Sequence, residues 1–269
     1  MKALKTRNNE LVSLAAIPVL DVDGFRTEIL LRAANGQRVT SFFATMLEGR
    51  EAILAVMADD ENSRLHLVAT RVAGDRYPSL TPEMPAMHLF ERELYEASGI
   101  LPEGHPWLKP VRYPHDAFDR TARMVDYPFF AVDGEEIHQV GVGPVHAGVI
   151  EPGHFRFNCQ GEDVLHLEIQ LGYQHRGVEG LMVERSAGGR FQNHLAESIA
   201  GDTVIGHAGT HARLIETLCG VLVSDRASVI RAIALEMERA AIHIGDLGAI
   251  AADIAFQMGA AVFGVTRTL

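Results

Sequence analysis

The stretch RVTSFFATMLEGREAILAVMADDENSRLHLVATRV, residues 38–72, decides the fold class of the first half of this chain. It contains three runs with strand-like composition, at 38–47, 52–58 and 64–72. Two short polar breaks separate these runs, and both have the composition of hairpin turns. The pattern therefore predicts an antiparallel meander.

Two helical segments flank the predicted meander. Asp21 or Asp23 can cap a helix that ends near Gly36, because glycine tolerates the positive φ of a helix C-terminus. Thr81 as cap and Pro82 at the first helical position predict a second, acidic helix that runs through residue 97. Helices beside an antiparallel sheet predict an α+β fold.

A change of texture predicts a second domain. Residues 99–133 are rich in proline, glycine and aromatic residues and show no periodicity, which is typical of a linker region. We therefore expect an α+β domain at 1–115, a linker at 116–134 and a second domain at 135–269.

The second domain is predicted to be a small β element that leads into a helix bundle. The strand-like pieces lie at 137–142, 154–159 and 164–170, and the helical segments at 176–185, 191–218 and from 224 onward. In the last segment, apolar residues spaced by three or four predict one buried seam. Its members are Ile230, Ile233, Met237, Ala241 and Ile244.

Composition excludes several classes of protein. The 269 residues have a formal net charge of −11, which repels a phosphate backbone, so nucleic acid is not an expected partner. The two cysteines form no C-x-x-C motif, so neither a disulfide scaffold nor a protein-held iron–sulfur cluster is expected, and a reducing cytosol fits best. Every apolar tract falls short of the roughly 20 residues that a bilayer requires.

One motif resembles a known family. The stretch ERELYEASGILPEGHPWLKP, residues 91–110, resembles a signature of the C component of respiratory NADH-quinone oxidoreductase (complex I). The matching positions are Glu91, Arg92, Glu93, Tyr95, Gly99, Ile100, Gly104, His105, Pro106 and Leu108. The chain departs from the signature at Glu96, Ser98 and Lys109, which leaves the subfamily open.

The second half resembles the D component of complex I and the large subunit of membrane-bound group 4 [NiFe]-hydrogenases of the formate hydrogenlyase type. Three blocks support this: GPVHAGVIEPGHFRF at 143–157, GYQHRGVEGLM at 172–182 and IRAIALEMERAAIHIGDLG at 230–248. The resemblance implies a fused C/D-like chain with an incomplete large-subunit-like portion.

The first metal-binding motif of that family is altered here. The family reads R-G-x-E followed by E-R-x-C-G-x-C, and its two thiolates bind the nickel–iron centre because soft sulfur suits nickel. This chain keeps Arg176 and Glu179 of the first part, but Ala200 and Thr203 stand at the two cysteine positions. The C-terminal D-P-C-x-x-C motif does not occur before Leu269. We therefore expect the hydrogen chemistry to be lost.

The resemblance also suggests which residues act in the altered site. The resemblance implies that the emptied metal cavity is a quinone pocket, as in complex I, so quinone binding is a hypothesis for this chain. Against it, the quinone sites of the family use a tyrosine donor, and no tyrosine lies at 191–207. The candidate catalytic residues are Glu179, His146, His154 and His207. The candidate cofactor-binding residues are Thr203, Ala200 and Arg176. No cofactor is expected within this chain; a [4Fe–4S] cluster is expected in a partner subunit.

Several of these residues have a structural interpretation as well. Arg176 and Glu179 could form a helical i, i+3 salt bridge instead of a proton relay. His207 and His211 have metal-ligand spacing, but no third ligand is evident, so no metal site is expected. The E-x-x-R-x-x-x-H residues at 236–243 could form a structural network or a proton path.

The sequence thus predicts a subunit of a complex I- or hydrogenase-like electron-transfer arm, cytoplasmic and peripheral to the inner membrane. It would dock an iron–sulfur small subunit, contact membrane subunits and line the altered cavity. The alternative is a non-catalytic assembly subunit. A helix bundle that stopped at Leu269 would leave its apolar seam exposed unless a partner covered it. We therefore expect either a truncated gene or an obligate complex.

Overall fold

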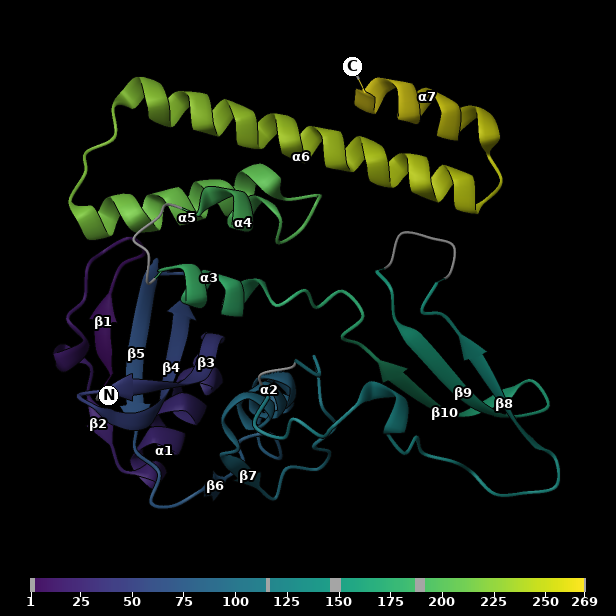
Figure 1. Cartoon of the computed structure of the whole chain (residues 1–269), viewed down its shortest axis with the longest axis horizontal. Helices are drawn as coiled ribbons and strands as arrows, with labels where there is room; N and C mark the ends of the chain where they lie inside the picture. The colour runs from purple at the N-terminus through teal and green to yellow at the C-terminus, as the bar shows by residue number, and fades with distance from the viewer. Residues whose placement is uncertain (1–2, 115–116, 146–150, 187–191, 269) are drawn as a thin grey trace. The chain divides into compact units, whose positions relative to one another are not determined.

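The computed structural model (Figure 1) describes residues 3–114, 117–145, 151–186 and 192–268. The chain forms two compact units, an N-terminal unit at Met1–Pro128 and a C-terminal unit at Phe129–Leu269. Both combine antiparallel strands with helices, which confirms the α+β class. The division falls inside 116–134, and the predicted domain bounds stay predictions.

The N-terminal unit is built on a five-stranded sheet. The strands are β1 (Leu4–Thr6), β2 (Val19–Leu20), β3 (Arg38–Leu47), β4 (Arg50–Asp59) and β5 (Arg64–Thr70). Their order is β1-β5-β4-β3, and β2 pairs with β5 in parallel. The predicted meander is therefore confirmed. Its first hairpin closes at Leu47 opposite Arg50, with Glu48 and Gly49 both at positive φ.

Helix α1 (Val22–Ala34) follows the prediction. Asp21 caps it by accepting a hydrogen bond from the Gly24 N–H at 2.7 Å. Its buried face includes Phe25 and Ile29, which pack into the main core with residues of β3, β4 and β5. A short 3₁₀ turn, η1 (Leu14–Ala16), precedes it.

Helix α2 (His88–Ser98) begins later than predicted. It follows a 3₁₀ turn, η2 (Pro85–Met87), and Thr81 does not cap it. The backbone N–H and the hydroxyl of Thr81 instead donate to the carboxylate of Glu91, so tertiary hydrogen bonds replace the expected local cap. The helix ends at Ser98, and its C-cap residue Gly99 has φ 79°.

The aperiodic region 99–133 contains structure that the sequence does not predict. It holds strand β7 (Leu101–Glu103) and a single turn, η3 (Met124–Asp126). Strand β7 pairs in parallel with β6 (Arg76–Pro78), which lies before α2 and was not predicted either. Each strand has three residues, too few for a period to show. Long-range parallel pairing of such short strands leaves no local signal.

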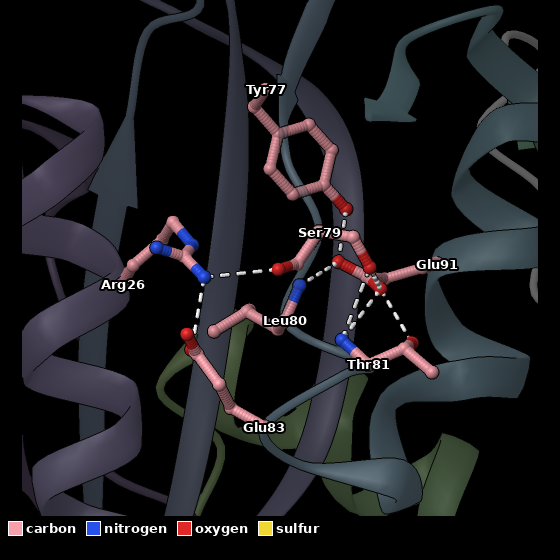
Figure 2. A network of polar contacts seen from close by, with 7 residues as sticks. All are labelled: Arg26, Tyr77, Ser79, Leu80, Thr81, Glu83 and Glu91. Atoms are coloured by element: carbon pink, nitrogen blue, oxygen red, sulfur yellow. Dashed lines mark hydrogen bonds and ion pairs between the residues drawn. The ribbon is translucent and has the colours of Figure 1, made fainter. Parts of the chain in front are cut away.

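A buried carboxylate organises the loop between β6 and α2. Glu91 is fully buried and its two oxygens accept five hydrogen bonds (Figure 2). The donors are the side chains of Tyr77, Ser79 and Thr81 and the backbone N–H groups of Leu80 and Thr81. Burial, followed by the neighbouring carboxylate, raises the pKa of Tyr77, so its phenol keeps the proton that it donates.

The C-terminal unit contains a three-stranded antiparallel sheet and five helices among its described residues. The strands β8 (Ile137–Val142), β9 (His154–Gln160) and β10 (Asp163–Gln170) match the three predicted strand-like pieces, and they lie in the order β10-β9-β8. The helices are α3 (Val178–Ser186), α4 (Asn193–Glu197), α5 (Val204–Cys219), α6 (Asp225–Asp253) and α7 (Gln257–Thr268). Helix α7 folds back along the end of α6 (Figure 1).

The two faces of this sheet differ in an unusual way. Glu168 and Asn158 are buried beneath the preceding segment, where Glu168 accepts from the Phe130 N–H at 2.8 Å and Asn158 donates to the Phe130 carbonyl. The opposite face is apolar, and its side chains remain well exposed. Val140 and Leu167, for example, are both 42% exposed.

Two helix predictions need correction. The segment 191–218 is not one helix, because the chain leaves helical geometry between α4 and α5. The apolar seam of α6 is also not buried within the described chain: Ile230, Ile233 and Met237 are 54%, 55% and 67% exposed. Periodicity identifies an apolar stripe, but it does not say what covers that stripe.

Candidate functional site

The altered motif forms the break between α4 and α5. Ala200 lies in this break, and Thr203 is the N-cap residue of α5. The Thr203 carbonyl accepts a hydrogen bond from the His207 N–H at 3.0 Å, which closes the first turn of the helix. The two former cysteine positions therefore stand outside regular helix, at the entry to α5.

Arg176 joins the R-G-x-E segment to this break. One terminal nitrogen of its guanidinium donates to the Ile199 carbonyl at 2.6 Å and also to the Ser198 carbonyl. One terminal nitrogen of a guanidinium can serve two carbonyls because it carries two N–H groups. The arginine therefore holds the segment before α3 against the turn that contains Ala200.

An open cavity of about 430 Å³ lies at this junction. It is lined by Glu151, Tyr173, Gln174, Arg176, Ala200, Gly201 and Asp202. Two of the predicted site residues, Arg176 and Ala200, therefore meet at one cavity. Glu179 and Thr203 are not among the described residues that line it, although both are close to it in sequence.

Tyr173 is the residue that the sequence interpretation missed. It supplies a phenol to the same cavity as Ala200, although it comes from the segment before α3 and not from 191–207. A tyrosine hydroxyl is protonated at neutral pH, and partial burial raises the pKa of Tyr173 further. The signal was present, since Tyr173 stands three residues before Arg176 in the GYQHRG block.

The predicted histidines lie elsewhere in the C-terminal unit. His154 begins β9, where its Nδ1 donates to the Gly143 carbonyl at 3.3 Å and its ring packs edge-on against Phe129. His207 lies in the first turn of α5 and is half-buried. Neither lines the described part of the cavity. His146 lies outside the described residues.

A second missed residue acts at the start of α5. Glu238 of α6 accepts hydrogen bonds from the N–H groups of Ile205, at 2.6 Å, and Gly206, at 3.0 Å. The nearby Glu236 and Arg239, taken from the sequence as a network or proton path, form an exposed ion pair with each other. Sequence spacing does not single out Glu238, because its contact appears only when α5 packs against α6.

Comparisons with known proteins place this chain in a family. Residues 11–129 match the model of the "Respiratory-chain NADH dehydrogenase, 30 Kd subunit" family. The chain is also 31% identical over 224 residues to formate hydrogenlyase subunit 5 of Escherichia coli K12, covering 75% of this chain and 39% of that protein. The chain belongs to the complex I and group 4 hydrogenase family. The predicted resemblance is therefore confirmed.

Further relatives come from both branches of this family. The chain is 29% identical over 247 residues to hydrogenase-4 component G of Escherichia coli K12, covering 85% of this chain and 42% of the relative. It is 27% identical over 236 residues to the C/D component of NADH-quinone oxidoreductase from Bacteroides thetaiotaomicron, covering 70% of this chain and 44% of the relative. The chain thus spans about two-fifths of the length of these curated relatives.

The residues at the altered motif do not fit a nickel–iron centre. Ala200, which lines the cavity, has only a methyl side chain, and Thr203 carries a hydroxyl where the motif requires a thiolate. The two cysteines are on β9 (Cys159, buried) and at the end of α5 (Cys219, exposed). Within the described ranges, no three His, Cys, Asp or Glu side chains converge as a metal site would require.

The described helices also bear on membrane association. None of them combines the length and the apolar character needed to cross a bilayer.

Proposed function

We propose that this chain is a subunit of the electron-transfer arm of a membrane-associated oxidoreductase complex, and that its altered site holds no nickel–iron centre. The observation behind this proposal is the cavity at Arg176 and Ala200. The arginine still fixes the turn of the metal-binding motif through the carbonyls of Ser198 and Ile199, while a methyl group replaces a thiolate.

Two exposed apolar surfaces support docking to other subunits. One is the sheet face that includes Val140 and Leu167, and the other is the stripe of α6 that includes Ile233 and Met237. Exposed apolar patches of this kind mark protein interfaces in soluble proteins. We assign them to the iron–sulfur small subunit and the membrane subunits of the same complex, because the relatives named above are hydrogenase and NADH-quinone oxidoreductase subunits.

The character of the cavity favours a ligand-binding role over a purely structural one. An assembly subunit with no chemistry would be expected to pack the emptied site with apolar side chains. The cavity instead remains open and is lined by polar groups of Glu151, Tyr173, Arg176 and Asp202. The non-catalytic assembly role is the alternative, and it predicts that no small molecule binds at this cavity.

Quinone is the ligand that we propose for the cavity, and Tyr173 is the observation that favours it. A quinone carbonyl needs a hydrogen-bond donor, and a tyrosine phenol is protonated and able to donate at neutral pH. In this proposal Tyr173, which lines the cavity, would supply the tyrosine donor that the segment 191–207 lacks.

Metal analysis of the intact complex tests the loss of nickel chemistry. The complex containing the full chain is purified from its host, and nickel is quantified by mass spectrometry beside a nickel-containing hydrogenase prepared in the same way. We expect far less than one nickel per chain. Stoichiometric nickel that follows this chain through purification would overturn the proposal.

A photoreactive short-chain quinone tests the proposed ligand on the same complex. Labelling is expected on the peptides that contain Tyr173 and Ala200, and the variant Tyr173→Phe is expected to reduce it. Tyr127→Phe, in the N-terminal unit, serves as the matched control. Labelling that avoids both peptides, or that Tyr173→Phe leaves unchanged, would exclude this quinone site and favour the assembly role.

A further inference from the structure

The N-terminus of α5 is capped by a different helix. Its first residue is Val204, so the N–H groups of Ile205 and Gly206 are the second and third of the helix. These two groups have no partner within a helix and are the usual targets of an N-cap side chain. Here the two carboxylate oxygens of Glu238 accept them, one each, at 2.6 Å and 3.0 Å.

This arrangement changes what Thr203 can do. Thr203 is the N-cap residue of α5, and threonine is a preferred N-cap because its hydroxyl accepts from the second or third N–H. Its side chain nevertheless makes no capping hydrogen bond. Both donors that it would serve are already bound to Glu238. The hydroxyl of Thr203 is therefore not used by its own helix.

Glu238 and Thr203 both lie near Gly206. A Cβ atom built on Gly206 would lie 3.6 Å from the Glu238 carboxylate and 3.9 Å from the Cβ of Thr203. The carboxylate and the threonine thus approach the same point at the start of α5. A carboxylate is also favoured here by the positive end of the helix dipole, so Glu238 is the stronger cap of the two.

We propose that Glu238 is a positioning residue of the altered site: it takes over the capping of α5 and so leaves the Thr203 hydroxyl available to a ligand. Thr203 stands at the second cysteine position of the motif, three residues after Ala200, which lines the cavity. The hydroxyl would serve a ligand with a hydrogen-bonding oxygen, such as a carbonyl compound. This role of Thr203 rests on the function proposed above.

A double-mutant cycle on the full chain tests the capping exchange. Amide hydrogen exchange of Ile205 and Gly206 is measured by NMR in the wild type, Thr203→Val, Glu238→Ala and the double variant. Thr203→Val keeps the side-chain shape and removes the hydroxyl. In the wild-type background we expect Thr203→Val to change the exchange protection factors of these two amides less than two-fold, because the hydroxyl caps nothing there.

In the Glu238→Ala background the same change is expected to lower protection about five-fold. There Thr203 becomes the cap, and losing a threonine cap costs about 1 kcal/mol, with 1.4 kcal/mol per tenfold. Glu236→Ala, on the same helix, is the matched control and is expected to create no such dependence. Glu238→Gln, which keeps one acceptor, is expected to give an intermediate value and covers the case in which Glu238→Ala does not fold.

Two outcomes would overturn the proposal. If Thr203→Val lowers protection equally in both backgrounds, Thr203 already caps the helix. If it is neutral in both, Glu238 is a structural cap and does not control the threonine.

In the complex, photoreactive-quinone labelling should fall in Thr203→Val and Glu238→Ala but not in Glu236→Ala. The exchange cycle involves neither nickel nor quinone, so its result stands apart from the fate of the proposed function.

Discussion

The most informative stability prediction concerns Glu91, the buried carboxylate of the N-terminal unit. One of its oxygens accepts from the Tyr77 hydroxyl at 2.9 Å and the Leu80 N–H at 2.7 Å. The other accepts from the Ser79 hydroxyl at 2.6 Å and from the N–H and hydroxyl of Thr81 at 3.1 Å and 2.6 Å. Every neighbour shown in Figure 2 that contacts these oxygens is a donor.

Replacing Glu91 with glutamine turns one acceptor oxygen into an NH₂ donor without changing the shape. Hydroxyl groups can rotate and become acceptors, but a backbone N–H cannot. Each oxygen serves one backbone N–H, that of Leu80 or that of Thr81, so either orientation of the amide leaves one buried N–H facing a donor. An unsatisfied buried group costs about 1–3 kcal/mol, and hydrogen bonds to a charged acceptor are worth about 1.5–3 kcal/mol. We expect Glu91→Gln to destabilise this unit by about 2–4 kcal/mol.

Urea unfolding followed by tryptophan fluorescence measures this loss. The chain has a single tryptophan, Trp107, which lies in the N-terminal unit and reports on it alone. Glu83→Gln is the control, since the ion pair of Glu83 with Arg26 is at the surface and its loss should cost at most about 1 kcal/mol. If the two variants unfold at the same urea concentration, the network around Glu91 does not hold the loop.

Two more predictions use the same fluorescence titration. Burial lowers the pKa of His66, so the unfolded state binds its proton more readily than the folded state. The free energy of unfolding should therefore fall as the pH drops below about 6.5. His66→Gln should make this fall between pH 7 and pH 5 less steep. Equal slopes would contradict this. Gly99→Ala should cost about 2–4 kcal/mol, because φ is 79° and the new Cβ would lie 2.6 Å from the Phe118 ring. Gly104→Ala, at φ 82° in open space, should cost only about 1 kcal/mol, and equal losses would show that the Phe118 contact is not tight.

Elements with local signals could be predicted from the sequence. The meander of β3, β4 and β5 follows from strand-forming runs and turn residues, and α1 follows from its aspartate cap. The three strands of the C-terminal unit were found for the same reason. In each case the residues that define the element lie within a few positions of one another, so periodicity and turn chemistry suffice.

Elements that depend on distant partners could not be predicted. Thr81 has the sequence environment of a helix cap, but Glu91 draws its N–H and hydroxyl into a buried network. The parallel pair of β6 and β7 joins segments about two dozen residues apart with no repeating pattern. Local propensity was overridden by tertiary hydrogen bonds in the first case and left no signal in the second.

The candidate site was predicted in part for the same reason. Motif spacing identified Arg176 and Ala200, which meet at the cavity. It did not identify Tyr173, because the search for a phenol was confined to the altered motif itself. It also did not identify Glu238, whose contact depends on how α5 and α6 pack.

The break between α4 and α5 can keep its geometry without sulfur. A helix break leaves carbonyl groups unpaired on one side and N–H groups unpaired on the other. Here a cation, Arg176, donates to the carbonyls that follow α4, and an anion, Glu238, accepts from the N–H groups that begin α5. Each charge is also the one that the helix dipole favours at that end. Two side chains from outside the break therefore fix its ends, so losing the thiolates at 200 and 203 need not collapse the cavity.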